Sequence, residues 1–288
     1  MNDRIVLITG ATSGIGKAAA TQLAKLGYTV IVHGRSQEKT RQVCDEIKTL
    51  TGSNKIEAIV ADLFLLTEVK EMADVFIKKY NRLDILINNA GGIMGTERET
   101  TQEGFEKTMA VNVFTPFLLT NLLLGLLKRS DDGRIINVSS NSHQLNASPD
   151  FNALQLEQGY TPLRAYGNAK LFLIWISQSL ATRLKGQGID HVTVNTLHPG
   201  AVKTNFGKES NLGFFLNLVG KLVRPLFKTV EQGADTIIYL ATSNDVKGKT
   251  GKYFVDRKEA RVAKKYHTAA NEQMVFRYCE ELTMAIGK

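Results

Sequence analysis

The chain has 288 residues, of which 43% are apolar, and it carries a formal net charge of +8; this is enough apolar material to bury a large core without disulfide bonds. Its two cysteines, Cys44 and Cys279, lie far apart with no C-x-x-C or His-rich neighbourhood, which argues against a disulfide framework or a zinc site and favours a reducing, cytoplasmic setting. The basic residues are dispersed and no nucleic-acid-binding motif accompanies them, so we expect an anionic cofactor or membrane surface, and no nucleic acid, to meet the positive charge.

Apolar, β-branched runs alternate with segments of helical period along most of the chain. Such alternation is typical of βαβ units around a parallel sheet. No Pro/Ser-rich linker and no repeat interrupts it, so residues 1–288 are predicted to form one α/β domain with helices on both faces of the sheet. The predicted strands, about seven, cover residues 5–9, 29–34, 56–62, 85–88, 134–139, 192–198 and 253–255.

The first apolar run begins directly after Met1-Asn2-Asp3-Arg4. This leaves no room for a signal peptide, and we expect the mature protein to begin at Met1. The most apolar stretch, residues 113–127, contains Pro116 and Asn121 and is shorter than the roughly 20 residues of a membrane span. We predict that it is a buried helix.

A glycine-rich turn follows the first predicted strand and opens a helix. Glycines there let the chain turn sharply and bring backbone N–H groups close to a pyrophosphate over the helix N-terminus. The spacing is G-x-x-x-G-x-G, and an ordinary strand-to-helix turn is the alternative. The candidate phosphate-binding residues are Gly10, Thr12, Ser13, Gly14, Ile15 and Gly16.

The end of the second predicted strand carries Gly34 and then Arg35. An NAD enzyme is expected to place a carboxylate near this point to bind the adenosine ribose hydroxyls. A guanidinium can pair with a 2′-phosphate instead. The sequence therefore favours NADP(H) over NAD(H), unless Arg35 is simply an exposed arginine.

Tyr166 and Lys170 lie four residues apart, on the same face of a predicted helix. Tyrosine has an ordinary pKa of about 10, and a neighbouring ammonium is expected to lower it. The phenol can then protonate a ketone oxygen or deprotonate an alcohol. This spacing alone is a common coincidence.

Six short motifs occur in order along the chain: Thr9 to Gly16, Asn88-Asn89-Ala90-Gly91, Asn112, Ser139-Ser140, Tyr166 to Lys170, and His198-Pro199-Gly200. Together they resemble the ordered motifs of the short-chain dehydrogenase/reductase family, and the resemblance covers nearly the whole chain. It implies a Rossmann-type, doubly wound parallel sheet. It also implies an NADP(H)-dependent oxidoreductase that moves a hydride between nicotinamide and a carbonyl or alcohol.

The resemblance implies roles for individual side chains. Tyr166 would be the general acid/base and would touch the substrate, and Lys170 would also hold the nicotinamide ribose. Ser140 would hydrogen-bond the reacting oxygen, with Ser139 as the runner-up. Asn112 would hold a water in a proton relay beyond Lys170. No metal is implied.

The same resemblance implies the remaining cofactor contacts. Asp62 and Leu63 would contact adenine, and the segment after the fourth strand would back the ribose. The turn after the sixth strand would bracket the nicotinamide carboxamide, through the Val202 backbone and the Thr204 hydroxyl. The residues to which the resemblance assigns these contacts are Asp62, Leu63, Asn89, Ala90, Gly91, Pro199, Gly200, Val202 and Thr204.

Two segments that follow strands depart from the alternating pattern, residues 141–161 and 205–228. Because ligands bind beyond the carboxyl ends of strands, both are predicted to wall the substrate pocket. The run from Ser139 to His143 is similar to the Ser-Ser-x-x-His stretch of retinol dehydrogenase-like enzymes. A helical tail is expected over about 260–288.

The segment over residues 205–228 is predicted to be a small substrate lid. Its apolar side chains suit a lipophilic substrate, such as a retinoid-like, medium-chain or aromatic aldehyde or ketone, or the matching alcohol. Its basic residues also allow peripheral contact with an anionic membrane. The alternative is that it packs on the core or on a second subunit of a homo-oligomer. The basic residues are Lys208, Lys221, Arg224 and Lys228.

Two other functions remain compatible with these motifs. One is a catalytically weak protein of the same fold that binds a dinucleotide as a sensor. The other is an enzyme like the light-dependent protochlorophyllide reductases, although the large insertion and active-site cysteines expected of these are not evident.

Overall fold

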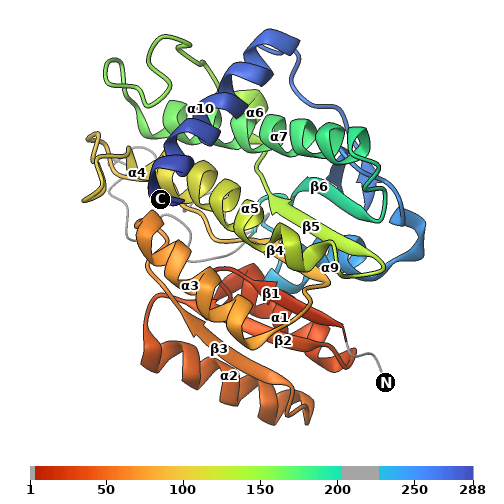
Figure 1. Ribbon diagram of the computed structural model, residues 1–288. Coiled ribbons are helices and arrows are strands. Elements are labelled where there is room, and N and C mark those ends of the chain that lie inside the picture. Colours follow the sequence, from red (N-terminus) through yellow and green to blue (C-terminus); the bar gives the residue numbers. More distant parts are fainter. Residues whose placement is uncertain (1–3, 203–226, 288) are drawn as a thin grey trace.

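The computed structural model of the protein describes residues 4–202 and 227–287. Their strands form one sheet in the order β3-β2-β1-β4-β5-β6-β7-β8 (Figure 1), in which β1 to β7 are parallel and β8 is antiparallel to β7. The order of the strands therefore reverses between β1 and β4. The strands are β1 (Ile5–Ile8), β2 (Thr29–Gly34), β3 (Ile56–Val60), β4 (Ile85–Asn88), β5 (Gly133–Val138), β6 (Val192–His198), β7 (Tyr253–Val255) and β8 (Lys258–Glu259).

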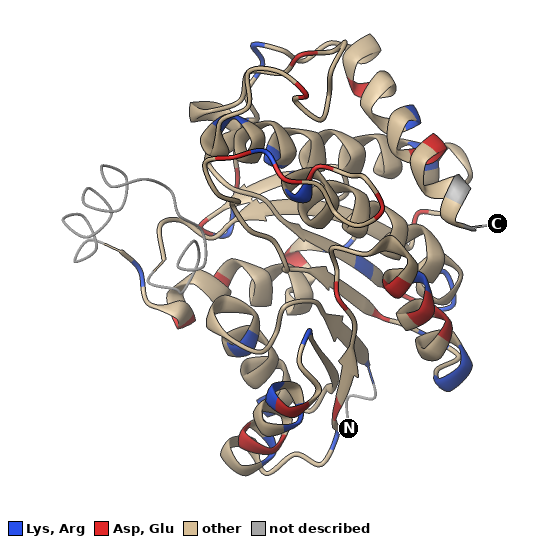
Figure 2. Ribbon diagram, turned by 90° about the vertical axis from the view of Figure 1, so that its left-hand side faces the viewer, with Lys and Arg blue, Asp and Glu red and all other residues tan. Residues whose placement is uncertain are grey.

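Helices connect the strands and cover both faces of the sheet, as the sequence predicts for the α/β class. Charged residues gather on these helices and on the loops around the sheet (Figure 2). The helices are α1 (Gly14–Lys25), α2 (Gln37–Thr51), α3 (Leu66–Lys79), α4 (Lys107–Met109), the π-helical η1 (Ala110–Phe114), α5 (Thr115–Leu127), α6 (Ser142–Leu145), α7 (Pro162–Gly186), α9 (Val230–Thr242), the 3₁₀ turn η3 (Asn244–Val246) and α10 (Ala269–Gly287).

The alternation of side chains along β1 separates two hydrophobic cores. Val6 and Ile8 point to the face covered by α1, α2 and α9, whereas Leu7 points to the face covered by α3, α5, α7 and α10. On the first face, α1 presents Ala19 and Ala20, which are small enough to let this helix approach the strands closely. This approach brings the N-terminus of α1 to the end of β1.

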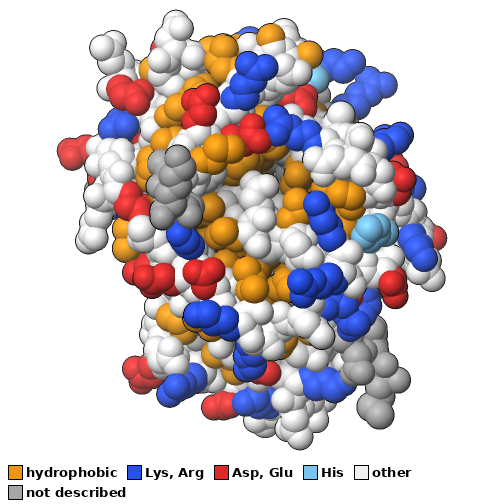
Figure 3. Space-filling view, in the orientation of Figure 1, with side chains coloured by type: hydrophobic (Ala, Val, Ile, Leu, Met, Phe, Trp, Pro, Cys, Tyr) orange, Lys and Arg blue, Asp and Glu red, His pale blue; other side chains and the backbone are white. Residues whose placement is uncertain are grey.

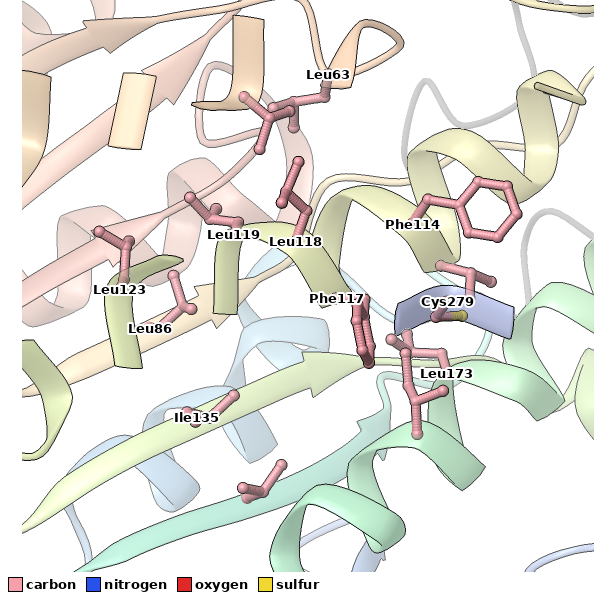
Figure 4. Packing of buried hydrophobic residues seen from close by; sticks show 14 of the residues in the cluster. Leu63, Leu86, Phe114, Phe117, Leu118, Leu119, Leu123, Ile135, Leu173 and Cys279 are labelled. Carbon is pink, nitrogen blue, oxygen red and sulfur yellow. The ribbon is translucent and has the colours of Figure 1, made fainter. Parts of the chain in front are cut away.

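The second core includes the C-terminal helix. Phe117 of α5, Leu173 of α7 and Cys279 of α10 point towards one another (Figure 4), and the last two are fully buried. The exterior of this face is hollowed between α5 and α7, and hydrophobic side chains surround the hollow (Figure 3). Thus α10 covers part of this helix layer and completes the core of the fold.

The predicted buried helix over residues 113–127 is longer than the sequence suggested. Within the described ranges, one continuous helical stretch, Lys107–Leu127, is long and apolar enough to cross a membrane, and 78% of its most apolar window is buried inside the protein. The length argument against a membrane span was therefore wrong. Its side chains nevertheless pack in the core between α3, α7 and the sheet.

Three of the predicted strands differ from the structure at their ends. The strands at residues 5–9 and 56–62 end at Ile8 and Val60, and the strand at 134–139 is shifted by one residue to Gly133–Val138. The two-residue β8 was missed because Lys258 and Glu259 are exposed and give no apolar signal. The predicted helical tail begins only at Ala269, because residues 260–268 include no helix.

Candidate active site

The carboxyl ends of β1, β4, β5 and β6 lie on one edge of the sheet, around the reversal of strand order. The glycine turn follows β1, and Asn89, Ala90 and Gly91 follow β4. Ser139 and Ser140 follow β5. Open α/β sheets bind ligands in the crevice at such a reversal. The fold therefore gathers most of the predicted site residues at one place.

Two glycines let the turn after β1 lie directly on the segment after β4. Gly10 has a φ of +63°, and a Cβ there would stand 2.9 Å from the Ala90 Cα. A Cβ on Gly16 would stand 2.4 Å from the Asn89 Nδ2 and 2.6 Å from the Gly10 carbonyl oxygen. Any larger residue at either position must push these backbones apart.

Side-chain hydrogen bonds fix this contact. The Thr9 hydroxyl accepts the N–H groups of Asn89 and Ala90, each at 3.0 Å. The Asn89 Nδ2 donates to the carbonyl oxygens of Thr9 and Gly10 at 2.9 and 3.2 Å. The Asn89 Nδ2 therefore holds the turn, and the contact of Asn89 with the ribose stays a prediction. Thr9 was predicted only as part of the motif that opens the glycine turn, without this structural role.

The turn leads into α1 with its helix N-terminus exposed. Ser13 is the N-cap residue of α1, yet its hydroxyl makes no capping hydrogen bond and its side chain is exposed. Thr12, Gly14 and Ile15 are half-buried beside it. Backbone N–H groups and a free hydroxyl at a helix N-terminus suit a pyrophosphate.

The end of β2 has no room for a side chain at Gly34. A Cβ there would stand 2.3 Å from the Thr40 Oγ1 and 2.4 Å from the Thr12 Cγ2. An acidic residue at this position, which would favour NAD(H), is therefore sterically excluded. Arg35 follows directly and is exposed, at the point where a 2′-phosphate would need a cation.

A buried histidine, which the sequence analysis did not select, supports the glycine turn from β2. The His33 Nδ1 accepts the Gly10 N–H at 3.1 Å, its Nε2 donates to the Ala61 carbonyl at 3.2 Å, and its carbonyl accepts the Ala11 N–H at 2.9 Å. Burial lowers the pKa of His33 to about 4, so the ring stays neutral and keeps an acceptor for Gly10. A histidine within an apolar strand was the available signal.

The two residues predicted to contact adenine lie in different surroundings, Asp62 in a turn and Leu63 with its side chain in the core. The Asp62 carboxylate accepts the Phe64 N–H at 3.0 Å, in the turn after β3. The Leu63 side chain is buried in the core on the α5 face, and its carbonyl accepts the Thr115 hydroxyl at 2.7 Å. The Leu63 side chain is therefore committed to packing, which leaves only its backbone for an adenine contact.

Tyr166 and Lys170 are both buried on α7. The Lys170 Nζ lies 5.5 Å from the centroid of the Tyr166 ring and donates to the Val138 carbonyl at 2.9 Å. Gly91 makes room for this amine, because a Cβ there would stand 3.1 Å from the Lys170 Nζ and 2.5 Å from the Asn112 Oδ1. The pair therefore touches both β5 and the segment after β4.

The electrostatics of this pair differ from the expectation. Burial raises the pKa of Tyr166, and only its hydrogen bond with the Ser140 hydroxyl opposes that effect. Burial also lowers the pKa of Lys170, to about 7. In the ligand-free protein, desolvation thus disfavours both the phenolate and the ammonium, and the net shift of the Tyr166 pKa is upward instead of downward as predicted.

Asn112 lies in the π-helical segment η1 and is fully buried. Its Nδ2 donates to the carbonyl oxygens of Gly92 and Thr108, both at 2.8 Å, and its Oδ1 accepts the Gly92 N–H at 3.3 Å. Single π-helical turns often occur at functional sites. The turn in η1 places the Asn112 side chain against Gly92, which follows β4 in the segment that also lies beside Lys170.

The two serines after β5 are not equivalent. Ser139 is buried, and its hydroxyl donates to the Lys170 carbonyl at 2.9 Å. Ser140 is only half-buried, and its hydroxyl accepts the Ser142 N–H at 3.2 Å and hydrogen-bonds with Tyr166. The geometry favours Ser140 for contact with a substrate, because Ser139 is engaged in fixing α7.

The turn after β6 meets the glycine turn over helix α9. A Cβ on Gly233 of α9 would stand 2.8 Å from a Val202 methyl and 3.1 Å from the Ile15 Cγ1. Val202 also pairs with Lys228 in an isolated parallel bridge, beside Gly200, which has a φ of +84°. Gly233 was not selected from the sequence, because an isolated helical glycine gave no signal there.

Some predictions fall on residues that the structure does not describe. Thr204 and residues 205–226 of the predicted lid lie outside the described ranges. Pro199 is half-buried at the start of the turn after β6. Across residues 4–202 and 227–287, no group of three or more His, Cys, Asp or Glu side chains is arranged to hold a metal ion.

Comparison with a family model finds that residues 4–213 match the short chain dehydrogenases. Human retinol dehydrogenase 14 is 39% identical over 273 residues, covering 90% of this chain and 80% of the relative. Human polyprenol dehydrogenase is 37% identical over 277 residues, covering 94% of this chain and 82% of the relative.

Solved structures give the same relationship. A short chain dehydrogenase from Shigella flexneri 2a, solved in complex with NADP, is 29% identical with a TM-score of 0.68, covering 90% of this chain and 98% of that chain. One from Escherichia coli CFT073, solved with NADPH, is also 29% identical with a TM-score of 0.68, covering 90% and 98%. A Mycobacterium paratuberculosis protein gives a TM-score of 0.77 at 27% identity, covering 98% and 93%.

Proposed function

The chain belongs to the short chain dehydrogenase family, and we propose that it is an NADP(H)-dependent oxidoreductase acting on the carbonyl or hydroxyl group of a lipophilic molecule. One observation carries the proposal. The buried Asn112, Tyr166 and Lys170 and the half-buried Ser140 converge beside the glycine turn, at the reversal of strand order. A cofactor held by that turn would therefore present its reactive end to these side chains.

The cofactor is NADP(H). The residues fit it because a Cβ would fill the cradle at Gly10, Gly16 and Gly91, and because Gly34 leaves no room for a carboxylate before Arg35. Relatives of the same family were solved with NADP and with NADPH. When bound, the nicotinamide supplies or accepts the hydride, and the protein supplies orientation and the proton.

Tyr166 is the general acid/base of this proposal. In the reducing direction its hydroxyl donates a proton to the carbonyl oxygen as the carbon gains hydride. In the oxidising direction the phenolate takes the proton of the alcohol. Ser140 hydrogen-bonds both the phenol and the reacting oxygen, which keeps them in line.

Lys170 and Asn112 have the role of returning to Tyr166 the proton that it donates to the substrate. With a pKa of about 7, Lys170 can gain and lose a proton near neutrality, and its ammonium stabilises the phenolate when it forms. The Asn112 Oδ1 and the Lys170 Nζ lie on the same side of Gly91, since a Cβ there would stand 2.5 Å from the first and 3.1 Å from the second. We assign Asn112 to the relay that returns the proton to Tyr166.

The lipophilic substrate is supported by the similar proteins and by the sequence. Two of them are named as retinol and polyprenol dehydrogenases, after alcohols that consist mostly of hydrocarbon. Residues 205–228 add an apolar segment directly after the site. Peripheral membrane contact through that segment, homo-oligomer formation and a cytoplasmic location stay predictions.

The test is a panel of retinoid, medium-chain and aromatic aldehydes and ketones, with NADPH or NADH as the hydride source. We expect turnover with NADPH, and we expect Tyr166→Phe to lower kcat by about 10²- to 10⁴-fold while NADPH binding is kept. A protein that NADPH stabilises against heat but that reduces no member of the panel would be a sensor and not this enzyme. Undiminished activity in Tyr166→Phe would refute the mechanism.

A further inference from the structure

Glu106 is a buried carboxylate to which the proposed mechanism gives no role. It is 1% exposed and stands at the start of the continuous helix that carries Asn112. Its carboxylate accepts the N–H groups of Thr108 and Met109 at 2.7 and 2.8 Å. It therefore satisfies two of the backbone donors that a helix N-terminus leaves without partners.

This cap is held in place by two distant segments. The Glu106 N–H donates to the Gln155 Oε1 at 2.7 Å, and the Gln155 Nε2 donates to the Tyr278 hydroxyl at 2.7 Å. Tyr278 belongs to α10, and its ring packs against Phe114 of η1 at 6.0 Å between centroids. The chain of hydrogen bonds thus runs from the C-terminal helix to the start of the asparagine-bearing helix.

Thr108, whose N–H group is capped by Glu106, also binds the side chain of Asn112. Thr108 donates its N–H to Glu106 and accepts the Asn112 Nδ2 at its carbonyl, at 2.8 Å. The other bonds of the Asn112 amide go to Gly92, next to the Gly91 that adjoins Lys170. A shift of the Thr108 peptide would therefore move the Asn112 amide relative to Lys170.

The geometry at the start of the helix suits the Glu106 carboxylate. Two acceptor oxygens meet two N–H donors, and the positive end of the helix dipole favours the negative charge. The neighbouring Lys107 pairs instead with Glu99 at the surface. Burial raises the pKa of Glu106, and its hydrogen bonds to Thr108 and Met109, with attraction from Arg98, oppose that effect. The backbone donors are thus the main partners of this charge.

We propose that Glu106, held by Gln155 and Tyr278, is a positioning residue that sets the Asn112 amide for proton relay. The inference rests on the proposed function, because it assigns Glu106 to the reaction through Asn112. It gives the C-terminal helix a place in catalysis although that helix contributes no group to the active site.

Glu106→Gln is the direct test, because it keeps the shape and leaves one acceptor for two donors. We expect kcat to fall about tenfold and the solvent deuterium isotope effect to rise, with the NADPH Kd and the substrate KM within about twofold. Tyr278→Phe should shift kcat in the same direction by a smaller factor. Glu99→Gln, which removes a surface carboxylate beside the same helix start, is the matched control and should match wild type.

A double-mutant cycle with Asn112→Ala separates the two proposals. Glu106→Gln should slow the Asn112→Ala enzyme no further, and additive losses would overturn the inference. Full activity in Asn112→Ala would instead refute the role assigned to Asn112. If Asn112→Ala is slow but Glu106→Gln keeps the wild-type kcat, only the inference is wrong.

A measurement on the ligand-free protein does not depend on turnover. The side-chain amide protons of Asn112, identified by NMR through their loss in Asn112→Ala, should exchange faster with solvent in Glu106→Gln than in Glu99→Gln. Equal exchange rates in a folded Glu106→Gln protein would overturn the inference. A variant that only lowers Tm and leaves kcat unchanged would mean that the cap serves stability alone.

Discussion

The cofactor end and the proton-transfer end of the candidate site depend on different kinds of residue. At the cofactor end, the glycine turn depends on the absence of side chains, because a Cβ on Gly10, Gly16 or Gly34 would stand within 3 Å of a neighbouring atom. At the proton-transfer end, buried polar side chains from different elements meet, and each depends on a hydrogen-bond partner. Asn112 and Lys170 both bond to backbone carbonyls there.

This contrast predicts how each end fails. Added volume should damage the cofactor end, since close-packed backbones have no space to yield. Removal of polar atoms should damage the proton-transfer end, since a buried donor left without an acceptor is costly. The first kind of damage should appear in cofactor affinity and the second in kcat.

The paired serines offer the sharpest form of this contrast. Ser140→Ala should lower kcat by about 10²- to 10³-fold, because it removes the hydroxyl that meets the reacting oxygen. Ser139→Ala should mainly lower Tm, because Ser139 donates to the Lys170 carbonyl. Steady-state kinetics and thermal melts on both variants check this. The reverse pattern would make Ser139 the catalytic serine.

Gly16→Ala should weaken NADPH binding by about ten- to 100-fold, because the added methyl meets Asn89 and the Gly10 carbonyl. The kcat at saturating NADPH should change much less. Gly125→Ala is the control, because its added methyl has nothing within 4 Å. Titration calorimetry gives the Kd values, and equal values for the two variants would contradict a close-packed turn.

Arg35→Ala should raise the Kd of NADPH about tenfold and leave that of NADH unchanged, since it removes a charge-assisted hydrogen bond to the 2′-phosphate. Arg129→Ala, at an exposed arginine near the end of α5, is the control. The loss at Arg35 should shrink as salt concentration rises. If Arg35→Ala raised the Kd values of NADPH and NADH equally, Arg35 would not determine the preference for NADPH.

The proton-transfer end should also carry a cost in stability that depends on pH. Because burial lowers the pKa of Lys170 from 10.5 to about 7, unfolding takes up a proton between these values. The native state therefore loses stability as pH falls from about 10.5 to about 7, and the cost is constant below that.

Lys170→Met should consequently raise the Tm of the ligand-free protein by about 5 °C at pH 7, and the gain should vanish towards pH 10. Thermal melts across this range check the prediction. Lys185→Met, at an exposed lysine on the same helix, should show no such pH dependence. A gain that is independent of pH would show that the wild-type amine carries no desolvation cost.

Much of the fold and part of the site could be predicted from local patterns. The alternation of apolar runs and helical segments located the strands β1 to β7, because each is an apolar run that spans the buried sheet. It missed β8, whose two exposed polar residues pair only because β7 lies alongside. The family motifs predicted Asn112, Ser140, Tyr166 and Lys170 as site residues, and the fold brings these four together.

Other features of the site could not be found in this way. His33 and Gly233 carry no motif, and their importance comes from Gly10 and Val202, which approach them only in the folded protein. The motif position of Leu63 did not show that its side chain belongs to the core, and its adenine contact stays a prediction for the backbone. The Tyr166 and Lys170 spacing gave the right helix face but not the direction of the net pKa shift of Tyr166, because burial acts on both groups.

The sequence by itself determined the class of fold, the glycine turn, the absence of a carboxylate at the end of β2 and the family. Each of these depends on short runs of residues, within which backbone geometry and side-chain period act directly, and the family on several such runs in order along the chain. Only the tertiary structure decided which serine faces Tyr166, that Asn89 holds the turn, and that Glu106 is tied to Tyr278, 172 residues further along the chain. These depend on burial and on contacts between distant segments, which exist only once the sheet has brought them together.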